Sequence, residues 1–406
     1  MTILVNDNIL SSLGFTTDEN YRKVKKGISG LQIFADRYDL PEPFMASEID
    51  GERLDKDFAK LFPKYEMIIR NSHWGDDMIA YLLDERNSIK NYSKLEKACI
   101  VSIDKALEGT GIDPTDKDVI FILSTTKGNV FLLDENERSG YEREQVYLWR
   151  SAEIIARFFG SFNSEYVVSN ACVSGASALM NAQRELQAGR SKYVIVTGVD
   201  TLSKFIVSGF QSFKALSQDI CKPFDANRSG LNIGEAAATM ILAERHAYAC
   251  NSGDIELTVG AMRNDANHIS GPSRMGEGAY LALHHILAGI APEEIAFVCA
   301  HGTATPYNDE MESVALTRAG LKDVPVFSLK GYFGHTLGAA GVLESVISTR
   351  ALKEGTILKT YGYDTPGVAC PLDIVMENRT TSKRRCIKML SGFGGCNAAI
   401  MFTKTL

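Results

Sequence analysis

The chain has 406 residues, of which 45% are hydrophobic and 23% charged, and its formal net charge is -7. These values are typical of a folded globular protein and exclude a disordered chain. An acidic chain is a poor ligand for nucleic acid, because phosphates repel it unless its basic residues gather on one face. We therefore expect no nucleic-acid partner.

No run of about 18 uncharged apolar residues occurs in the sequence, so we expect no membrane span. The N-terminal segment MTILVNDNIL has no basic region leading into an apolar one, which indicates that no secretory signal is present. None of the eight cysteines forms a C-x-x-C pair. We expect them to be reduced and mostly buried, in a cytoplasmic protein.

Short β-branched runs bounded by Gly, Asn or Asp alternate with helix-length segments. The expected strands are residues 119–123, 166–169, 193–197, 295–299 and 324–327. The expected helices are residues 174–188, 311–319 and 338–353. The strands do not alternate with polar residues, which is typical of strands covered on both faces. The pattern predicts an α/β fold with a mainly parallel core sheet.

Two segments share one pattern, in which a strand runs into a helix of small residues. They are VVSNACVSGASALMNA, at 167–182, and VFSLKGYFGHTLGAAGVLESV, at 326–346. A repeated strand–helix unit can indicate a duplicated chain, but the two segments share a pattern and not an identity. From the pattern alone, two related halves and an unduplicated chain remain equal alternatives.

Cys172 follows an expected strand and lies at or just before the start of an expected helix. Free backbone N–H groups and the positive end of the helix dipole gather at such a position. This setting favours a thiolate, which is a nucleophile, and the same N–H groups can stabilise an oxyanion. An inert buried cysteine is the alternative that this segment leaves open.

His301 follows the expected strand 295–299 directly, so it lies at the strand end where open α/β sheets place their sites. A histidine can supply or remove a proton near neutral pH. Thr303 and Thr305 offer two hydroxyls to one side of an extended segment. We expect Asp309 to begin the next helix as its N-cap. A structural histidine is the alternative.

Lys330 and His335 lie close together after another strand, among glycines and alanines. The glycine spacing fits neither dinucleotide nor P-loop patterns and indicates tight helix packing instead. A buried lysine is costly unless it is paired, and Glu344 on the following helix is the expected partner. Further on, Phe393 is flanked by glycines, which predicts either a hinge with a bulky tip or a plain turn between strands.

In this order, the four segments resemble the β-ketoacyl-acyl-carrier-protein synthases, the elongating condensing enzymes of the thiolase superfamily. Further similar segments are KPFD at 222–225 and DANH at 265–268, and the resemblance extends from about residue 9 to the C-terminus. It implies a duplicated thiolase-like α/β fold with five layers, α-β-α-β-α. Residues 1–252 would form the half with the nucleophilic cysteine. Residues 253–406 would form the half with His/Lys/His and the Gly-Phe-Gly-Gly gate.

The resemblance also implies roles for individual residues. Cys172 would accept an acyl chain as a thioester, and His301 and His335 would hold the malonyl thioester and promote loss of carbon dioxide. Lys330, paired with Glu344, would position the histidines. The backbone N–H groups of Cys172 and Phe393 would form the oxyanion hole, and the Phe393 side chain would act as a gate. The implied substrate-binding residues are Thr303, Thr305, Phe210, Ser270 and Asn397, with Phe205 and Phe213 as further candidates for the acyl pocket.

The implied partner is an acyl carrier protein with phosphopantetheine-linked acyl and malonyl groups, and no metal or redox cofactor is required. The family is normally homodimeric, and a heterodimer with a related subunit is the alternative. Carrier proteins are acidic, so a local basic patch is needed on this acidic chain. The candidates are Lys127, Lys204 and Lys214.

Three other kinds of protein share parts of this pattern. Non-catalytic partner subunits resemble the active ones but lack the cysteine at position 172. Degradative thiolases use a second cysteine in a C-terminal glycine-rich loop, where this chain has Cys396, and initiating enzymes carry asparagine where His335 stands. Ser391 and Cys396 depart from the family pattern, in which an aromatic residue and a threonine occur. These departures leave the acyl chain and the carrier contacts open.

Overall fold

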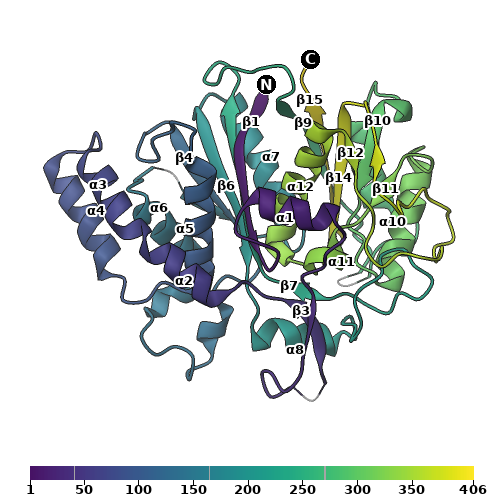
Figure 1. Cartoon of the computed structure of the whole chain (residues 1–406), viewed down its shortest axis with the longest axis horizontal. Coiled ribbons are helices and arrows are strands. Elements are labelled where there is room, and N and C mark those ends of the chain that lie inside the picture. Colours follow the sequence, from purple (N-terminus) through teal and green to yellow (C-terminus); the bar gives the residue numbers. More distant parts are fainter. Residues whose placement is uncertain (41, 164, 269–270) are drawn as a thin grey trace.

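The computed structural model describes residues 1–40, 42–163, 165–268 and 271–406. Its main feature is a large mixed sheet with the strand order β11-β10-β14-β15-β9-β1-β8-β6-β4-β5, and helices lie on both faces of this sheet (Figure 1). The predicted α/β class is confirmed, but the predicted mainly parallel sheet is wrong: among the described residues, four of its nine strand pairings are parallel and five are antiparallel.

The sheet consists of two groups of strands with the same internal order. The first group comprises β1 (Thr2–Ser11), β4 (Val119–Ser124), β5 (Glu165–Val168), β6 (Tyr193–Asp200) and β8 (Ala236–Glu244). The second comprises β9 (Ile255–Asn264), β10 (Ile295–Cys299), β11 (Val326–Phe327), β14 (Arg385–Gly392) and β15 (Cys396–Lys404).

From its outer edge inward, each group has two parallel pairings followed by two antiparallel ones. The groups meet where β1 pairs with β9, with Thr2 opposite Leu257. The repetition supports the predicted division between residues 252 and 253, which remains a prediction.

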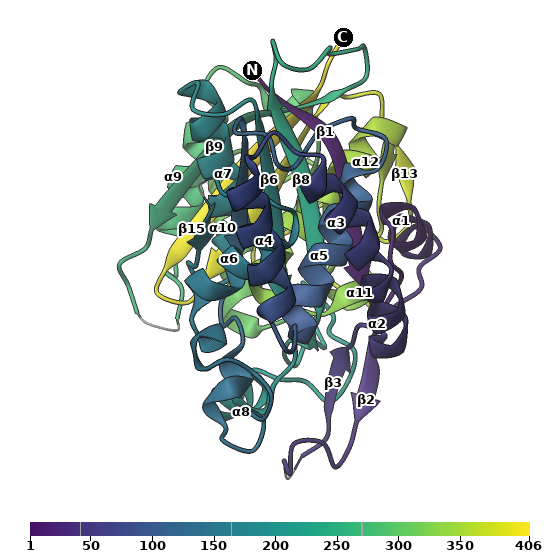
Figure 2. The ribbon, with the colours of Figure 1, turned by 90° about the vertical axis from the view of Figure 1, so that its left-hand side faces the viewer.

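The helices complete five layers, as Figures 1 and 2 show. The middle layer contains α7 (Ser174–Gln187) and α12 (Ala340–Glu354). The outer layer on the first group contains α5 (Lys94–Leu107) and α6 (Leu148–Phe158), and the outer layer on the second contains α9 (Glu277–Ile286) and α10 (Pro306–Arg318). The predicted α-β-α-β-α arrangement is therefore confirmed.

Smaller elements surround these layers. They are α1 (Thr17–Lys25), α2 (Gly51–Ala59), α3 (Leu61–Arg70), α4 (Asp76–Ser88), α8 (Lys204–Ser212), α11 (Lys330–Phe333), β2 (Gln32–Phe34), β3 (Phe44–Ser47), β7 (Ile233–Gly234), β12 (Thr356–Ile357) and β13 (Arg379–Thr380). Strands β2, β3 and β7 form a small sheet that lies with α8 below the main sheet in Figure 1.

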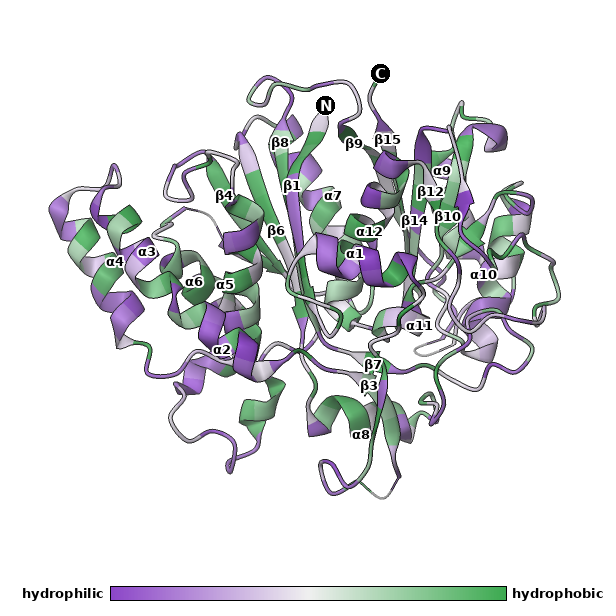
Figure 3. Ribbon diagram, in the orientation of Figure 1, coloured by the Kyte–Doolittle hydropathy of each residue, from purple (hydrophilic) through white to green (hydrophobic). Residues whose placement is uncertain are grey.

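Burial explains why the strands have continuous apolar sequences. Every residue of β4 is buried, because α6 of the outer layer and α7 of the middle layer both pack against it. In Figure 3 the strands of the first group are hydrophobic over much of their length, whereas the exposed helices α2 and α4 carry many hydrophilic residues. Hydrophobic burial between the layers is thus the main driving force for this arrangement.

Glycines allow the two middle helices to touch at their N-termini. A Cβ atom on Gly341 would lie 2.4 Å from the backbone nitrogen of Ala176, and one on Gly175 would lie 2.7 Å from that of Val342. Such distances are shorter than any tolerated contact, so only glycine fits at either position. The predicted tight packing of small residues is confirmed.

The structure changes two predicted boundaries. The strand expected at 324–327 is limited to Val326–Phe327. The helix expected at 311–319 begins earlier, at Pro306, and Thr305 takes the N-cap position. Asp309 therefore lies inside the first turn and not at the cap. Its carboxylate accepts the backbone N–H of Thr303 at 3.0 Å and that of Phe224 at 2.7 Å.

Two further expectations concern membrane-spanning helices and the state of the cysteines. Among the residues that the structure describes, no helix combines the length and the apolar character needed to cross a membrane. The eight cysteines are all free thiols, and five of them are buried.

Candidate active site

Cys172 lies in a sharp turn between β5 and α7. Ala171, just before it, has a φ of +45°, which is the left-handed region of the backbone. The Ser174 hydroxyl accepts the N–H of Asn170 at 2.7 Å and donates to the carbonyl of Ala171 at 2.5 Å, which holds the turn together. The side chain of Cys172 is 8% exposed and lines the main pocket.

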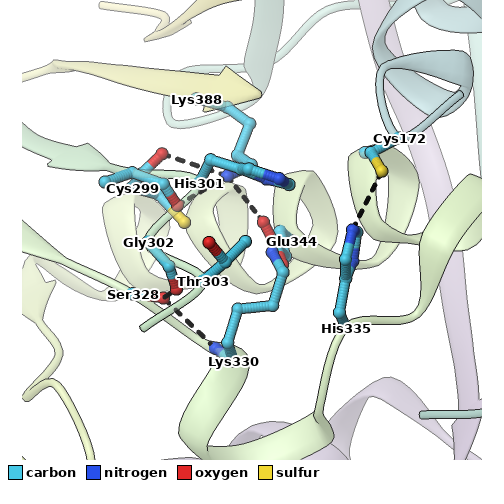
Figure 4. Close-up of polar contacts among 12 residues, drawn as sticks. Cys172, Cys299, His301, Gly302, Thr303, Ser328, Lys330, His335, Glu344 and Lys388 are labelled. Atoms are coloured by element: carbon cyan, nitrogen blue, oxygen red, sulfur yellow. Dashed lines mark hydrogen bonds and ion pairs between the residues drawn. The ribbon is translucent and has the colours of Figure 1, made fainter. Parts of the chain in front are cut away.

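His335 is the direct partner of Cys172. Its Nε2 lies 3.0 Å from the Cys172 Sγ, although the two residues are 163 positions apart in the sequence (Figure 4). The backbone N–H of Leu337 donates to Nδ1 of the same ring at 3.3 Å. A neutral ring whose Nδ1 accepts carries its proton on Nε2, so we assign an Nε2–H that points at the sulfur.

The backbone around His335 is held from both sides. Its N–H donates to the carbonyl of Asn232 at 2.6 Å, and its carbonyl accepts the N–H of Gly234 at 3.0 Å. Leu337 has a φ of +49°, and the buried carboxylate of Asp200 accepts the next N–H, that of Gly338, at 2.6 Å. These contacts fix the turn that aims the imidazole at Cys172.

His301 follows β10 and lies beside the pair. Both its own N–H and that of Gly302 donate to the carboxylate of Glu312 at 2.7 Å. The rings of His301 and His335 are 5.0 Å apart at 83°. Ring nitrogens of the two histidines and the Cys172 Sγ all lie within 4.8 Å of one another. His301 Nδ1 is buried and has no hydrogen-bond partner in the described part of the chain, so a ligand can take that place.

A buried ion cluster lies behind the histidines. Lys330 Nζ contacts Glu344 Oε1, as the sequence predicted, and Lys388 Nζ lies 2.6 Å from Glu344 Oε2. The side chains of both lysines are 0% exposed and that of Glu344 is 2% exposed. Lys388 was not predicted from the sequence. The feature that could have pointed to it is a single lysine within the apolar segment Cys386–Leu390 of β14.

Phe393 lies in the turn between β14 and β15. The segment is therefore a turn between strands, as one alternative predicted, and its tip carries a bulky side chain, as the other predicted. Its backbone N–H hydrogen-bonds the Cys172 sulfur, and a Cβ atom on Gly392 would lie only 3.2 Å from the backbone nitrogen of Cys172. The Phe393 ring is 39% exposed and packs against Phe210 and Phe213, with ring centroids 5.9 Å and 5.5 Å away.

A cavity of about 600 Å³ leads to these groups. The candidate residues that line it are Cys172, His301, His335, Thr303, Thr305, Phe210, Phe213, Phe393 and Asn397. The hydroxyls of Thr303 and Thr305 lie 2.8 Å apart. Phe205 does not line the cavity: it is 54% exposed, on the outer side of α8. Ser270 lies outside the described residues.

The sequence was compared with models of known protein families. The model of the β-ketoacyl synthase N-terminal domain matches residues 76–247, and the model of its C-terminal domain matches residues 256–364. The chain belongs to the β-ketoacyl synthase family.

Three curated relatives are similar over much of the chain. A putative mitochondrial 3-oxoacyl-[acyl-carrier-protein] synthase of Schizosaccharomyces pombe is 31% identical, over 63% of this chain and 65% of the relative. A putative polyketide β-ketoacyl synthase 1 of Streptomyces halstedii is 28% identical, over 80% of this chain and 85% of the relative. A 3-oxoacyl-[acyl-carrier-protein] synthase 2 of Vibrio cholerae is 33% identical, over 58% of this chain and 61% of the relative. The chain thus matches slightly less than two thirds of two of these relatives.

Solved structures have the same fold. A ketosynthase in complex with its chain length factor from Xenorhabdus doucetiae superposes with a TM-score of 0.81 at 23% identity, over 100% of this chain and 98% of that one. A β-ketoacyl synthase from Burkholderia phymatum superposes with a TM-score of 0.81 at 23% identity, over 100% of this chain and 99% of that one. The duplicated thiolase-like fold that the resemblance implied is the fold of this chain.

Burial sets the protonation states in the synthase. It lowers the pKa of His301 and His335 well below the ordinary value, and the positive charge of Lys330 lowers both further. Both rings are therefore neutral at pH 7. Burial also raises the pKa of Cys172 to about 11, against the opposing charges of Lys330 and Lys127. The predicted thiolate is wrong for the folded chain, because desolvation outweighs the charges of Lys330 and Lys127 and the backbone N–H of Phe393.

Proposed function

We propose that this β-ketoacyl synthase condenses an acyl chain, held as a thioester on Cys172, with a malonyl group on an acyl carrier protein. The product is a 3-oxoacyl group on the carrier, and the reaction releases carbon dioxide. The observation that carries the proposal is the arrangement of Cys172, His301 and His335 at the buried end of one cavity. No metal is needed, and the net positive charge of Lys330 and Lys388 with Glu344 disfavours a cation beside these residues.

In the first step the Cys172 sulfur attacks the carbonyl of the carrier-bound thioester. The new sulfur–carbon bond forms as the carrier's sulfur–carbon bond breaks, and the Cys172 proton leaves with the carrier thiol. That proton passes to the leaving carrier thiolate within the pocket, because the His335 nitrogen that faces the sulfur, Nε2, already carries a proton and acts as a donor. The backbone N–H groups of Cys172 and Phe393 would stabilise the oxyanion of the tetrahedral intermediate. Covalent capture divides one difficult condensation into two easier steps.

In the second step malonyl loses carbon dioxide. The electron pair of the broken carbon–carbon bond forms an enolate whose negative charge rests on the thioester oxygen. The Nε2–H of His335 and a ring N–H of His301 would stabilise that oxygen in a dry site. The enolate carbon then attacks the Cys172 thioester carbonyl, and the sulfur leaves and regains a proton. Neutral histidines can fill this role because each keeps one ring N–H that donates a hydrogen bond to the oxygen.

Supporting residues follow from the same proposal. Lys330 and Glu344 would position the histidines, and Thr303 and Thr305 would bind the phosphopantetheine arm near the cavity mouth. Phe210 and Asn397 would contact the acyl or malonyl group. Phe393 would move aside between the two steps, because Gly394 and Gly395 beside it already adopt left-handed φ values of +84° and +78°.

For its partners, we propose an acidic acyl carrier protein and a second copy of this chain. Of the three lysines expected at the carrier-docking surface, Lys214 lines the cavity, Lys127 is exposed, and Lys204 lies 3.5 Å from Asp39. The edge strand β5 has a half-exposed Tyr166 and Val167 and would pair with the second copy. A heterodimer is the alternative, since the Xenorhabdus doucetiae ketosynthase is in complex with a chain length factor. Fatty-acid chain elongation and a cytoplasmic location remain predictions.

Mass spectrometry tests the reaction directly. The purified chain is incubated with acyl carrier proteins that bear acyl chains of different lengths, and Cys172 should gain the mass of the acyl group. Addition of malonyl carrier protein should then release carbon dioxide and a 3-oxoacyl carrier. Cys172→Ala should do neither, whereas the matched variant Cys250→Ala, at a half-buried cysteine remote from the cavity lining, should react like the wild type. Unchanged condensation by Cys172→Ala would overturn the proposal.

Native mass spectrometry tests the assembly. A stable homodimer that accepts acyl groups supports the homodimer, whereas a monomer that becomes active only with a related subunit supports the heterodimer.

A further inference from the structure

We propose that Lys388 is a positioning residue for His301, and that its charge adds to burial and to the charge of Lys330 in keeping the two active-site histidines neutral. This inference rests on the proposed condensation reaction and adds a residue to it. Lys388 lies in the middle of β14, and its side chain is fully buried. Alternation along the strand places it on the same face as Cys386 and Leu390, which is the face that α12 covers.

The contacts of Lys388 converge on the segment before His301. Its Nζ donates to the carbonyl of Cys299 at 3.1 Å and to that of Ala300 at 2.9 Å (Figure 4). These two residues are the last before His301. On the other side of His301, the Glu312 carboxylate accepts two backbone N–H groups. A buried ammonium group and a buried carboxyl group therefore hold the peptide units before and after His301.

The third contact of Lys388 determines the charge of the cluster. Each oxygen of Glu344 faces one lysine, Oε1 facing Lys330 and Oε2 facing Lys388. Burial by itself would lower the pKa of Lys388, but Cys299 and Glu344 raise it above its ordinary value, so the ammonium stays charged. Two lysines and one glutamate leave one net positive charge behind the imidazoles.

Other charged groups face the same region from different elements. Lys330 comes from α11, Glu344 from α12, and both Glu312 and Asp309 from α10. Lys388 lowers the pKa of both His301 and His335. Without Lys388, Glu344 would balance Lys330 completely, and the histidines would become easier to protonate. A protonated His335 has both ring nitrogens as donors and can no longer accept the Leu337 N–H.

Packing does not require a charge at this position. On the face of β14 that α12 covers, the neighbours Cys386 and Leu390 are apolar, and the Lys330–Glu344 pair is complete without a second cation. A hydrophobic side chain in place of a buried charged one is often neutral or stabilising. The contacts to the residues before His301 are therefore the feature of Lys388 that a hydrophobic side chain could not replace.

The test compares Lys388→Met with Lys383→Met. Lys383 is a matched control because its Nζ also donates to a carbonyl of β10, at 3.1 Å, but to Ile295 at the opposite end of the strand. For Lys388→Met we expect the kcat of condensation to fall roughly ten- to a hundredfold, with a smaller change in the KM for the acyl carrier. We expect Lys383→Met to match the wild type.

The pH profile separates positioning and charge from a structural role. Removal of a positive charge raises the histidine pKa values, so the acidic limb of kcat should move to higher pH in Lys388→Met. Lys388→Arg keeps the charge, and its acidic limb should stay where the wild type has it. A folded Lys388→Met with the kcat and the acidic limb of the wild type would overturn the inference. If Lys388→Met aggregates, Lys388→Gln tests the same shift.

NMR of protein labelled with 13C at the histidine Cε1 gives a readout that does not need turnover. The His301 and His335 resonances should titrate at higher pH in Lys388→Met than in the wild type, and identical titrations would contradict the inference. A wild type that fails to condense would instead overturn the proposed function, while the titration still tests the effect of Lys388.

Discussion

The Nε2 of His335 lies 3.0 Å from the Sγ of Cys172, and the Leu337 N–H on the far side of the ring fixes the proton on Nε2. This contact joins the turn before α7 to the loop before α12, and these are the two helices of the middle layer. Because it points a fixed donor at the place where the thioester will form, it determines which steps depend on His335.

Replacement of His335 by alanine should separate the two steps. We expect the rate of condensation to fall by about 10²–10³, which is typical for loss of one donor to an oxyanion. Formation of the acyl-Cys172 thioester should persist, because the backbone N–H groups of Cys172 and Phe393 remain. Single-turnover acylation followed by mass spectrometry, with product analysis after malonyl carrier is added, measures both rates.

The exposed His284 on α9 provides the control, since His284→Ala should leave both rates unchanged. Equal losses of acylation and condensation in His335→Ala would contradict the assignment of His335 to the second step.

The thiol of Cys172 should react slowly at neutral pH. Burial raises its pKa to about 11, so only a small fraction is thiolate at pH 7.5. The rate of alkylation by iodoacetamide, followed on the Cys172 peptide between pH 6 and about 11, should rise throughout this range. A rate that levels off below about pH 8 would show that the helix N-terminus outweighs desolvation after all.

Glu312 should make folding stability depend on pH. Burial raises its pKa from 4.5 to about 7, so the folded state holds the proton more tightly than the unfolded chain does. This contribution is fully present below about pH 4.5 and is lost as the pH rises through about 7. Glu312→Gln removes this pH-dependent contribution. Between pH 4.5 and 7.5, the free energy of unfolding of the wild type should therefore fall by on the order of 1–3 kcal/mol relative to that of the variant.

Urea unfolding at several pH values measures the difference between Glu312→Gln and the wild type. The neighbouring Asp309, whose pKa burial raises to about 6, is present in both proteins, and its charge contributes to the raised pKa of Glu312. A difference that does not change with pH would contradict the raised pKa of Glu312.

Gly341→Ala should destabilise the synthase. A Cβ atom there would lie 2.4 Å from the backbone nitrogen of Ala176, so α12 and α7 must separate. We expect a loss of at least about 2 kcal/mol in the free energy of unfolding, together with slower acylation, because α7 carries Cys172 at its start. Gly51→Ala, where no atom lies within 4 Å of the added Cβ, should stay within about 0.5 kcal/mol of the wild type.

The sequence by itself determined the local features of this protein. Apolar runs indicated the buried strands, and the strand-to-helix change placed Cys172 at a helix start. The position of His301 at a strand end and the pairing of Lys330 with Glu344 could also be predicted, because each depends on neighbours within one or two elements.

Tertiary structure decided what depends on contacts between distant segments. The pairing of Cys172 with His335 requires both halves to pack through Gly175 and Gly341. The contact of Lys388 with Glu344 appears only when β14 lies against α12. The protonation of Cys172 also depends on burial, which the local sequence does not contain, and this is why the predicted thiolate is a thiol in the folded chain.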